Sequence, residues 1–207
     1  MALALLFAVP LAAAEPAAWE CEVSGAVYVL PDEEDFVQPT ARADRGRLHL
    51  ETRYNYEDRH SLSAFAGASF AFGERAEVTL TPMLGGVAGD TDGIVSALEA
   101  DLAAGMFEAY GEAEYVFDLE DSSESFFYLW SELSLRPKEW LRAGLVAQRT
   151  RVYQTERDLQ RGLLVGFSFR KLEGTLYAFN PGSDDHFTVV SLGLAFPFTG
   201  WSRSRGR

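Results

Sequence analysis

Hydrophobic and polar residues alternate along residues 46–58, GRLHLETRYNYED. One parity carries Leu48, Leu50, Thr52, Tyr54 and Tyr56. The other parity carries Arg47, His49, Glu51, Arg53 and Asn55. Because successive side chains of a strand point to opposite faces, this period of two predicts a strand with one mostly apolar and one charged face. In a soluble sheet the apolar face would point to a core, whereas in a membrane barrel it would point to lipid.

The same alternation recurs along most of the chain. It is clear over residues 37–44, 61–72, 107–117, 127–135 and 162–170, and no window outside the N-terminal segment has a convincing helical period. The pattern predicts an all-β chain of about twelve strands, many of about ten to twelve residues, as tilted transmembrane strands require. The weakest segments are 21–30 and 36–43, and without them about ten strands would remain.

The connections between these segments alternate in kind. Very short connections rich in glycine and charge occur at 44–46, 73–75, 104–105, 136–138 and 170–171. Between them lie acidic, mostly longer connections at 31–35, 57–60, 88–93, 119–125, 153–158 and 180–185. Tight turns at one end and longer loops at the other are typical of outer-membrane barrels. The sequence therefore predicts a closed antiparallel up-and-down transmembrane β-barrel.

The distribution of aromatic and charged side chains predicts which face meets lipid. Aromatic residues of the apolar face lie near the strand ends, whereas a soluble core would place them in the middle of each strand. We predict an aromatic girdle of Tyr54, Tyr56, Phe70, Phe72, Phe107, Tyr115, Phe117, Phe127, Trp140, Phe167, Phe169, Phe196 and Phe198. We predict a lumen lined by Arg47, His49, Glu51, Arg53, Glu99, Asp101, Glu108, Glu112, Glu114, Glu132 and Arg142. The charged face is enclosed because arginine or lysine at the bilayer midplane costs ~2–4 kcal/mol.

The terminal segments and the composition predict where the barrel begins and ends and which partners are excluded. The apolar run from Leu3 to Leu11, followed by Ala12 to Ala14, predicts a cleaved secretory signal over 1–14, although it lacks the basic flank of such signals. The barrel then spans 15–198, and a basic tail spans 199–207. A formal charge of −13 argues against nucleic-acid partners. The lone Cys21 is expected to be an inert thiol.

These features resemble the bacterial outer-membrane β-barrel family. The final segment adds to the resemblance, since Ser191, Gly193, Phe196 and Phe198 are similar to the C-terminal signal by which such barrels are recognised for insertion. Pro197 and the tail after it depart from that signal. The resemblance implies export through the periplasm to the outer membrane, with both chain ends in the periplasm. It also implies contact with outer-membrane lipid, lipopolysaccharide and the barrel-assembly machinery.

The inward residues leave several functions open. An excess of carboxylates favours a small pore for passive passage of small polar or cationic solutes. If the acids pair with the arginines and fill the barrel, it would instead be a closed structural or adhesive barrel. A lipid hydrolase at the rim would need His60-Ser61 or His186, but no nucleophile motif is present. A soluble lipocalin-like or sandwich fold is a further alternative. No cofactor, metal site or catalytic residue is expected.

Overall fold

The computed structural model describes residues 18–31, 34–152 and 158–198. The predicted signal segment 1–14 and the tail 199–207 lie outside the described residues. No helix in the described part of the chain is long and apolar enough to cross a bilayer.

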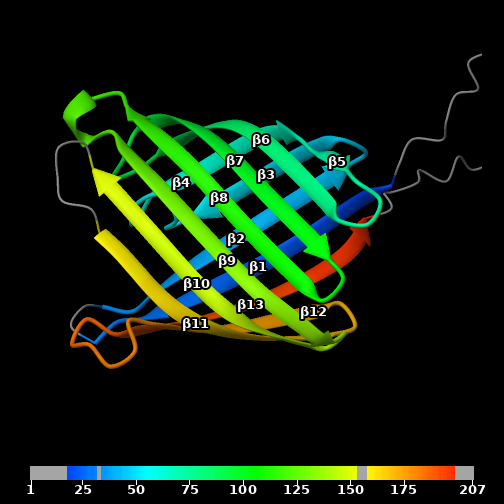
Figure 1. The fold of residues 1–207 in the computed structure, drawn as a ribbon. Coiled ribbons are helices and arrows are strands. Elements are labelled where there is room, and N and C mark those ends of the chain that lie inside the picture. The colour runs from blue at the N-terminus through cyan, green and yellow to red at the C-terminus, as the bar shows by residue number, and fades with distance from the viewer. Residues whose placement is uncertain (1–17, 32–33, 153–157, 199–207) are drawn as a thin grey trace, which may run out of the picture.

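Strands make up most of the described chain (Figure 1). In chain order they are β1 (Trp19–Val29), β2 (Phe36–Arg45), β3 (Leu48–Tyr54), β4 (Leu62–Ala68), β5 (Phe70–Phe72), β6 (Glu77–Ala88), β7 (Gly93–Ala104), β8 (Phe107–Asp118), β9 (Phe126–Lys138), β10 (Leu141–Val152), β11 (Asp158–Phe169), β12 (Leu172–Phe179) and β13 (Phe187–Phe198). One 3₁₀ turn, η1 (Ser122–Glu124), lies among them in the described residues.

The strands form one closed antiparallel sheet. Apart from β4 and β5, which do not pair with each other, each strand pairs with its neighbours in sequence, and β1 pairs with β13 along its whole length, from Trp19 opposite Phe198 to Val29 opposite Thr188. β4 and β5 both pair with β6 in one unbroken register, so they are a single wall strand interrupted at Ser69. The described residues therefore form a closed barrel of twelve wall strands, as the sequence predicts, and the two weakest segments, β1 and β2, both belong to the wall.

The two ends of the barrel differ. At the end that we call the tight-turn end, strands are joined by residues 46–47, 73–76, 105–106, 139–140 and 170–171. Gly46 and Gly105 have φ values of 62° and 64°, a left-handed conformation that glycine adopts without strain. At the opposite loop end the described connections include 55–61, 89–92, 119–125 and 180–186. This asymmetry matches the predicted alternation of connections.

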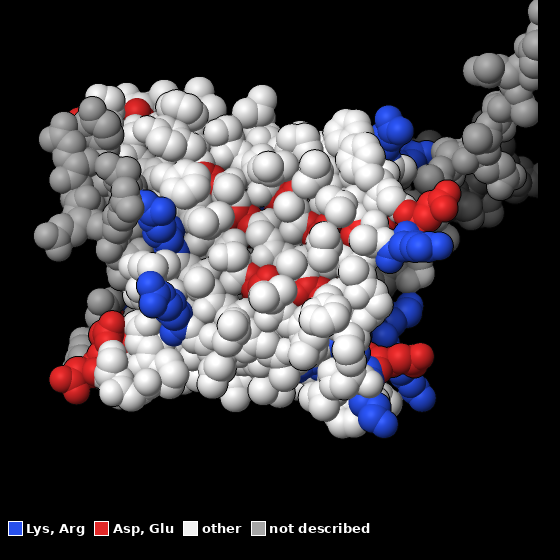
Figure 2. Space-filling view, in the orientation of Figure 1, with Lys and Arg blue, Asp and Glu red and all other residues white. Residues whose placement is uncertain are grey.

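Side-chain burial confirms the predicted orientation of the wall. Along β3 the exposed residues are Leu48, Leu50, Thr52 and Tyr54, and the buried ones are His49, Glu51 and Arg53. The outer surface consequently exposes leucine, valine and isoleucine from almost every strand. In Figure 2 the blue residues gather towards both ends of the barrel and the band between them is mostly white. The hydrocarbon-compatible residues therefore form the outside of the cylinder.

Two apolar clusters occupy much of the loop-end half of the interior. The larger contains Tyr28, Trp130, Val146, Leu164, Tyr177, Phe179, Phe187 and Val189. In it the Phe179 and Phe187 rings stack with centroids 4.6 Å apart. The smaller contains Phe65, Met83, Val87, Val95, Ala97 and Val116. Open space inside the barrel is consequently concentrated towards the tight-turn end.

The exposed belt predicts a depth-dependent penalty for charge. Leu145 lies opposite Leu133 and Leu163 in the middle of the wall and is 57% exposed. We expect Leu145→Arg to lower the unfolding free energy in lipid bilayers by about 2–4 kcal/mol. Leu172→Arg is the control, because Leu172 begins β12 beside a tight turn, where the cost falls to about 0–1 kcal/mol. Urea titration of refolded protein measures both, and equal penalties would contradict a lipid-facing belt.

Candidate functional site inside the barrel

A buried arginine, Arg53 of β3, organises one side of the barrel interior. Its Nε lies 2.6 Å from Glu51 Oε1, and its Nη1 lies 2.6 Å from Glu112 Oε1 and also pairs with Glu114. The guanidinium stands over the rings of Tyr56 and Phe65, at 4.3 and 4.7 Å from their centroids. One charged group therefore joins strands β3 and β8 across the interior.

A second arginine extends this network to β2 and β7. Arg42 Nη2 lies 2.7 Å from Glu99 Oε1, and Arg42 Nε lies 3.3 Å from Glu51 Oε2. The Tyr110 hydroxyl lies 3.1 Å from Glu99 Oε1 and 2.9 Å from Glu112 Oε2. We call this set the Arg53 network; it contains Arg42, Arg53, Glu51, Glu57, Glu99, Glu112 and Glu114. Carboxylates outnumber arginines in it, so pairing alone does not balance its charge.

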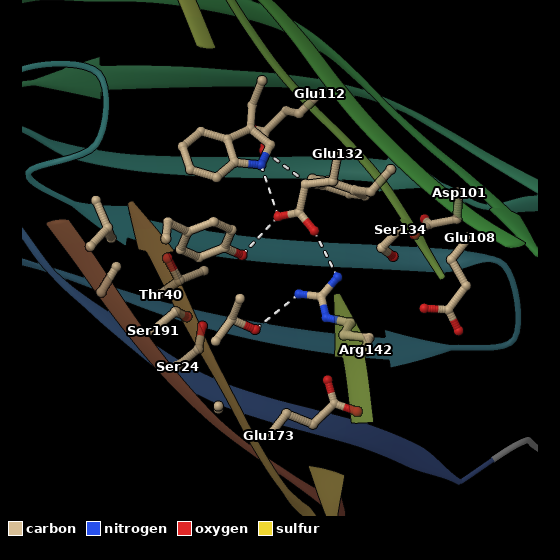
Figure 3. Close-up of a pocket in the computed structure, with 18 of the residues that line it drawn as sticks. Ser24, Thr40, Asp101, Glu108, Glu112, Glu132, Ser134, Arg142, Glu173 and Ser191 are labelled. Carbon is tan, nitrogen blue, oxygen red and sulfur yellow. Dashed lines mark hydrogen bonds and ion pairs between the residues drawn. The ribbon is translucent and has the colours of Figure 1, made fainter. Parts of the chain in front are cut away.

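A separate polar cluster surrounds Glu132 of β9 (Figure 3). Its Oε2 lies 2.7 Å from Arg142 Nη1, and its Oε1 accepts hydrogen bonds from Trp130 Nε1 at 3.0 Å and the Tyr177 hydroxyl at 2.7 Å. Arg142 Nη2 also donates to Thr175 Oγ1 at 2.9 Å. Gly166 gives Arg142 its room, since a Cβ there would lie 2.6 Å from Arg142 Nε.

Between these clusters lies a cavity of about 490 Å³ on the tight-turn side, which we call the vestibule. Its carboxylates are Glu22, Asp101, Glu108, Glu112, Glu132 and Glu173, and its arginines are Arg42, Arg136 and Arg142. Hydroxyl groups of Ser24, Thr40, Ser134 and Ser191 also line it (Figure 3). The vestibule is therefore polar, with six carboxylates against three guanidinium groups.

The vestibule acids fall into paired and unpaired groups. Glu108, for example, lies 2.5 Å from Arg136 Nε near the tight-turn end. None of the ion pairs among the described residues involves Glu22, Asp101 or Glu173. These three carboxylates are therefore open to contact with a solute in the vestibule.

A second cavity, of about 160 Å³, lies on the loop side of the vestibule, and we call it the inner pocket. It is lined by Tyr28, Gln38, Tyr56, Glu57, Glu114, Phe126, Tyr128 and Gln148. Tyr28, Gln38, Tyr56 and Tyr128 line both cavities. The rings of Tyr56 and Tyr128 meet edge to face, with centroids 5.9 Å apart. We call these four side chains the tyrosine partition, because they separate the two spaces.

The structure brings most of the predicted lumen residues together inside the wall. His49, Glu51, Arg53, Glu99, Glu112, Glu114 and Glu132 are buried. Glu108 and Arg142 are half-buried, and Asp101 is exposed at the tight-turn end, where all three line the vestibule. Arg47 does not lie in the lumen. It lies in the exposed turn before β3, beyond the end of the wall, with its guanidinium 5.4 Å from the centroid of the Phe70 ring.

Tyr56 is the other predicted residue that lies elsewhere. The alternation of β3 predicts an outward ring, but Tyr56 points into the barrel and donates to Glu112 Oε2 at 2.8 Å. The cause is Asn55, whose left-handed φ of 56° ends the strand pattern after Tyr54. The Asn55 side chain stabilises that bend by accepting from His60 N at 2.8 Å and donating to Val37 O at 3.0 Å.

The other aromatic residues of the predicted girdle lie on the outer face where their side chains are described. Tyr54, Phe72, Phe107, Phe117, Trp140, Phe167 and Phe169 are exposed, and Phe70, Tyr115, Phe127 and Phe196 are half-exposed. The side chain of Phe198 lies outside the description, although its backbone pairs with Trp19. Rings such as Phe107 and Phe169 begin or end their strands, at the depth where a bilayer interface would lie.

Sequence reasoning missed part of the interior. Tyr110 and Trp130 share the inward parity of Glu112 and Glu132, and this parity could have identified them as lumen residues. Glu57 carried no such signal, because it follows the bend at Asn55 rather than a strand. Burial raises the pKa of the Glu57 carboxyl above its ordinary value, while the positive charge of Arg53 acts in the opposite direction.

One set of interior residues has the proximity of metal ligands. Ligand atoms of His49, Glu51 and Glu99 lie within 4.8 Å of one another. The guanidinium groups of Arg42 and Arg53 lie against the same carboxylates, and His49 Nδ1 already pairs with Asp44 Oδ1 at 2.8 Å. Cationic neighbours at hydrogen-bond distance disfavour a divalent ion at this position.

The residues considered for hydrolysis at the loop end have separate partners. His60 Nδ1 lies 3.1 Å from Asp90 Oδ2. Ser61 Oγ donates to Arg59 O and accepts from Thr91 N at 3.1 Å. His186 Nδ1 contacts Ser183 O at 3.0 Å. These contacts stabilise loops and assemble no nucleophile and base among the described residues.

The Arg53 network predicts a large effect of removing its central charge. Arg53→Met leaves Glu51, Glu112 and Glu114 without their shared partner inside the barrel. We expect the free energy of unfolding to fall by about 3–5 kcal/mol, measured by urea titration of the folded barrel. The matched control is Arg136→Met, which breaks a partly exposed pair and should cost at most about 1 kcal/mol. A small effect at Arg53 would show that the network contributes little stability.

Comparisons with known proteins agree on the fold. No family model and no curated protein matches the chain. Among solved structures, a KdgM porin aligns with a TM-score of 0.56 at 10% identity, over 86% of this chain and 99% of that chain. The KdgM porin in complex with disordered oligogalacturonate aligns with a TM-score of 0.57 at 10% identity, over 86% and 99% of the two chains. The NanC porin aligns with a TM-score of 0.54 at 6% identity, over 86% and 100%. The chain has the closed-barrel architecture of bacterial outer-membrane porins.

Proposed function

We propose that this chain is a small outer-membrane channel for passive passage of small polar or cationic solutes. The observation that carries the proposal is the vestibule, a polar cavity of about 490 Å³ enclosed by a lipid-compatible wall. A purely structural barrel of this size would gain stability by filling that space with side chains. Asp101 and Glu173 line the vestibule and are exposed to solvent, which supports entry of solutes at the tight-turn end.

The charge of the vestibule supports a preference for cations. Six carboxylates and three arginines line it, and the unpaired acids create a negative potential at its mouth. The KdgM porin, whose fold is similar, has been solved in complex with disordered oligogalacturonate, which is an acidic sugar chain. An acidic vestibule would repel such an anion, so we propose a different solute class for this chain.

The proposed setting is the outer membrane of a bacterium. The exposed aliphatic belt and the aromatic residues at the strand ends suit contact with outer-membrane lipid and lipopolysaccharide. The last strand, which carries Ser191, Gly193 and Phe196, would engage the barrel-assembly machinery after export through the periplasm. Short turns face the periplasm in such barrels, so the vestibule would open on that side.

A closed barrel is the second candidate. The two apolar clusters at the loop end favour it, because they occupy much of that half of the interior. In this case the tyrosine partition would seal the barrel, and folded protein would produce no current.

Conductance in planar bilayers tests the channel and its charge selectivity. Under a tenfold KCl gradient a perfectly cation-selective channel approaches about 59 mV. We expect the unaltered protein to have a cation-selective reversal potential and the double variant Asp101→Asn/Glu173→Gln to move it towards zero, because unpaired vestibule charge is removed. Glu74→Gln is the control, since Glu74 is exposed in the turn before β6. Absence of current steps would refute the channel, and an unchanged potential in the double variant would refute the role of the vestibule acids.

The tyrosine partition predicts a second change in conductance. Tyr128→Ala removes a ring that borders both cavities, so the passage between them should widen and single-channel conductance should rise. Tyr115→Ala is the control, because Tyr115 lies on the outward parity of β8. Equal conductance in Tyr128→Ala and the unaltered protein would show that the partition does not limit flow.

A further inference from the structure

We propose that the inner pocket is a binding site for a small organic ammonium ion. This inference rests on the proposed function, because the pocket lies on a solute path only if the barrel is a channel. It names the class of solute that this channel would favour. The pocket lies between the tyrosine partition and the loop end: Glu57 follows β3 there, and Phe126 begins β9 there. A solute passing between the loop end and the vestibule would meet it next to the partition.

An unpartnered carboxylate is the first observation behind this site. The Glu57 side chain has no exposed area, and neither of its oxygens has a hydrogen-bond partner. Its contact with Arg53 Nη1 is long, at 3.9 Å. A buried carboxylate with no donor at hydrogen-bond distance is unfavourable, whereas an N–H donor of an ammonium group placed in the pocket would satisfy it.

The charge of the surrounding network is the second observation. Arg53 directs its Nε and Nη1 to Glu51, Glu112 and Glu114, and its Nη1 stays 3.9 Å from Glu57 Oε1. The Arg53 network as a whole holds five carboxylates and two arginines. A bound cation would offset part of this excess at Glu57, whose only cationic contact among the described residues is the long one with Arg53.

The remaining walls of the pocket select an organic cation. Rings of Tyr28, Tyr56, Phe126 and Tyr128 line it, and aromatic faces attract alkylammonium groups. The amides of Gln38 and Gln148 add polar contacts without charge. A bare metal ion would gain little from four rings, whereas an alkylammonium ion matches both the rings and the carboxylate. The cavity of about 160 Å³ suits a small molecule of this kind.

The test is calorimetric titration of detergent-folded full-length barrel with propylammonium chloride. We expect saturable binding that Glu57→Gln weakens by about tenfold, which corresponds to about 1.4 kcal/mol. Phe126→Leu should weaken it several-fold while leaving every carboxylate in place. Glu124→Gln is the matched control, because Glu124 is exposed at the same end, in η1, and its substitution should change nothing.

Two further probes separate the alternatives. 1-Butanol has a similar size without charge and should not bind, and potassium chloride should not compete at equal concentration. Undetectable propylammonium binding, or equal binding by Glu57→Gln and the unaltered protein, would overturn the site. Equal competition by potassium would overturn its selectivity for organic cations. Binding without conductance would retain the site and reject the channel. Conductance without binding would retain the channel and reject the site.

Discussion

Closure of the sheet through β1 and β13 is the constraint on which the rest of this structure depends. Inside hydrocarbon a backbone N–H or C=O has no water to bind, so every wall strand needs a partner on both sides. The continuous register from Trp19–Phe198 to Val29–Thr188 supplies the last ladder. Once the cylinder is closed, the period of two gives each residue only two destinations, lipid or lumen. Charged residues deep in the wall, such as Glu51, Arg53 and Glu112, are thereby committed to an enclosed space.

Enclosed charges are stable only when they are neutralised, and the interior pairs some of its carboxylates with arginines but not others. Arg53 and Arg42 draw glutamates from β3, β7 and β8 together, and Arg142 neutralises Glu132. The pairs of Arg53 and Arg42 join β2 and β3 to β7 and β8 across the interior, whereas Arg142 and Glu132 lie on the neighbouring strands β10 and β9. Around the vestibule Glu22, Asp101 and Glu173 have no ion pair within the described part of the chain, and in the inner pocket Glu57 has only a long contact with Arg53. Paired acids therefore serve the barrel as a structure, and unpaired acids remain for interaction with solutes.

The wall could be predicted from the sequence because it depends on local periodicity. The exposed Leu48 and Leu50 and the buried Glu51 and Arg53 follow directly from the alternation of one strand. Tyr56 could not be placed this way, because a single left-handed residue, Asn55, ended the pattern. The pairing of Arg53 with Glu114 joins residues 61 positions apart. Such a contact depends on strand tilt and barrel diameter, and no local pattern encodes either.

The division of the lumen into two cavities follows from where large inward rings meet. Tyr28, Tyr56 and Tyr128 come from a strand, a loop and another strand, and they converge because Asn55 redirects Tyr56 inwards. The hydroxyl of Tyr56 is held by Glu112, which is itself held by Arg53. The partition is thus attached to the same network that stabilises the barrel. The ion pairs that stabilise the barrel therefore also hold the tyrosine partition in place.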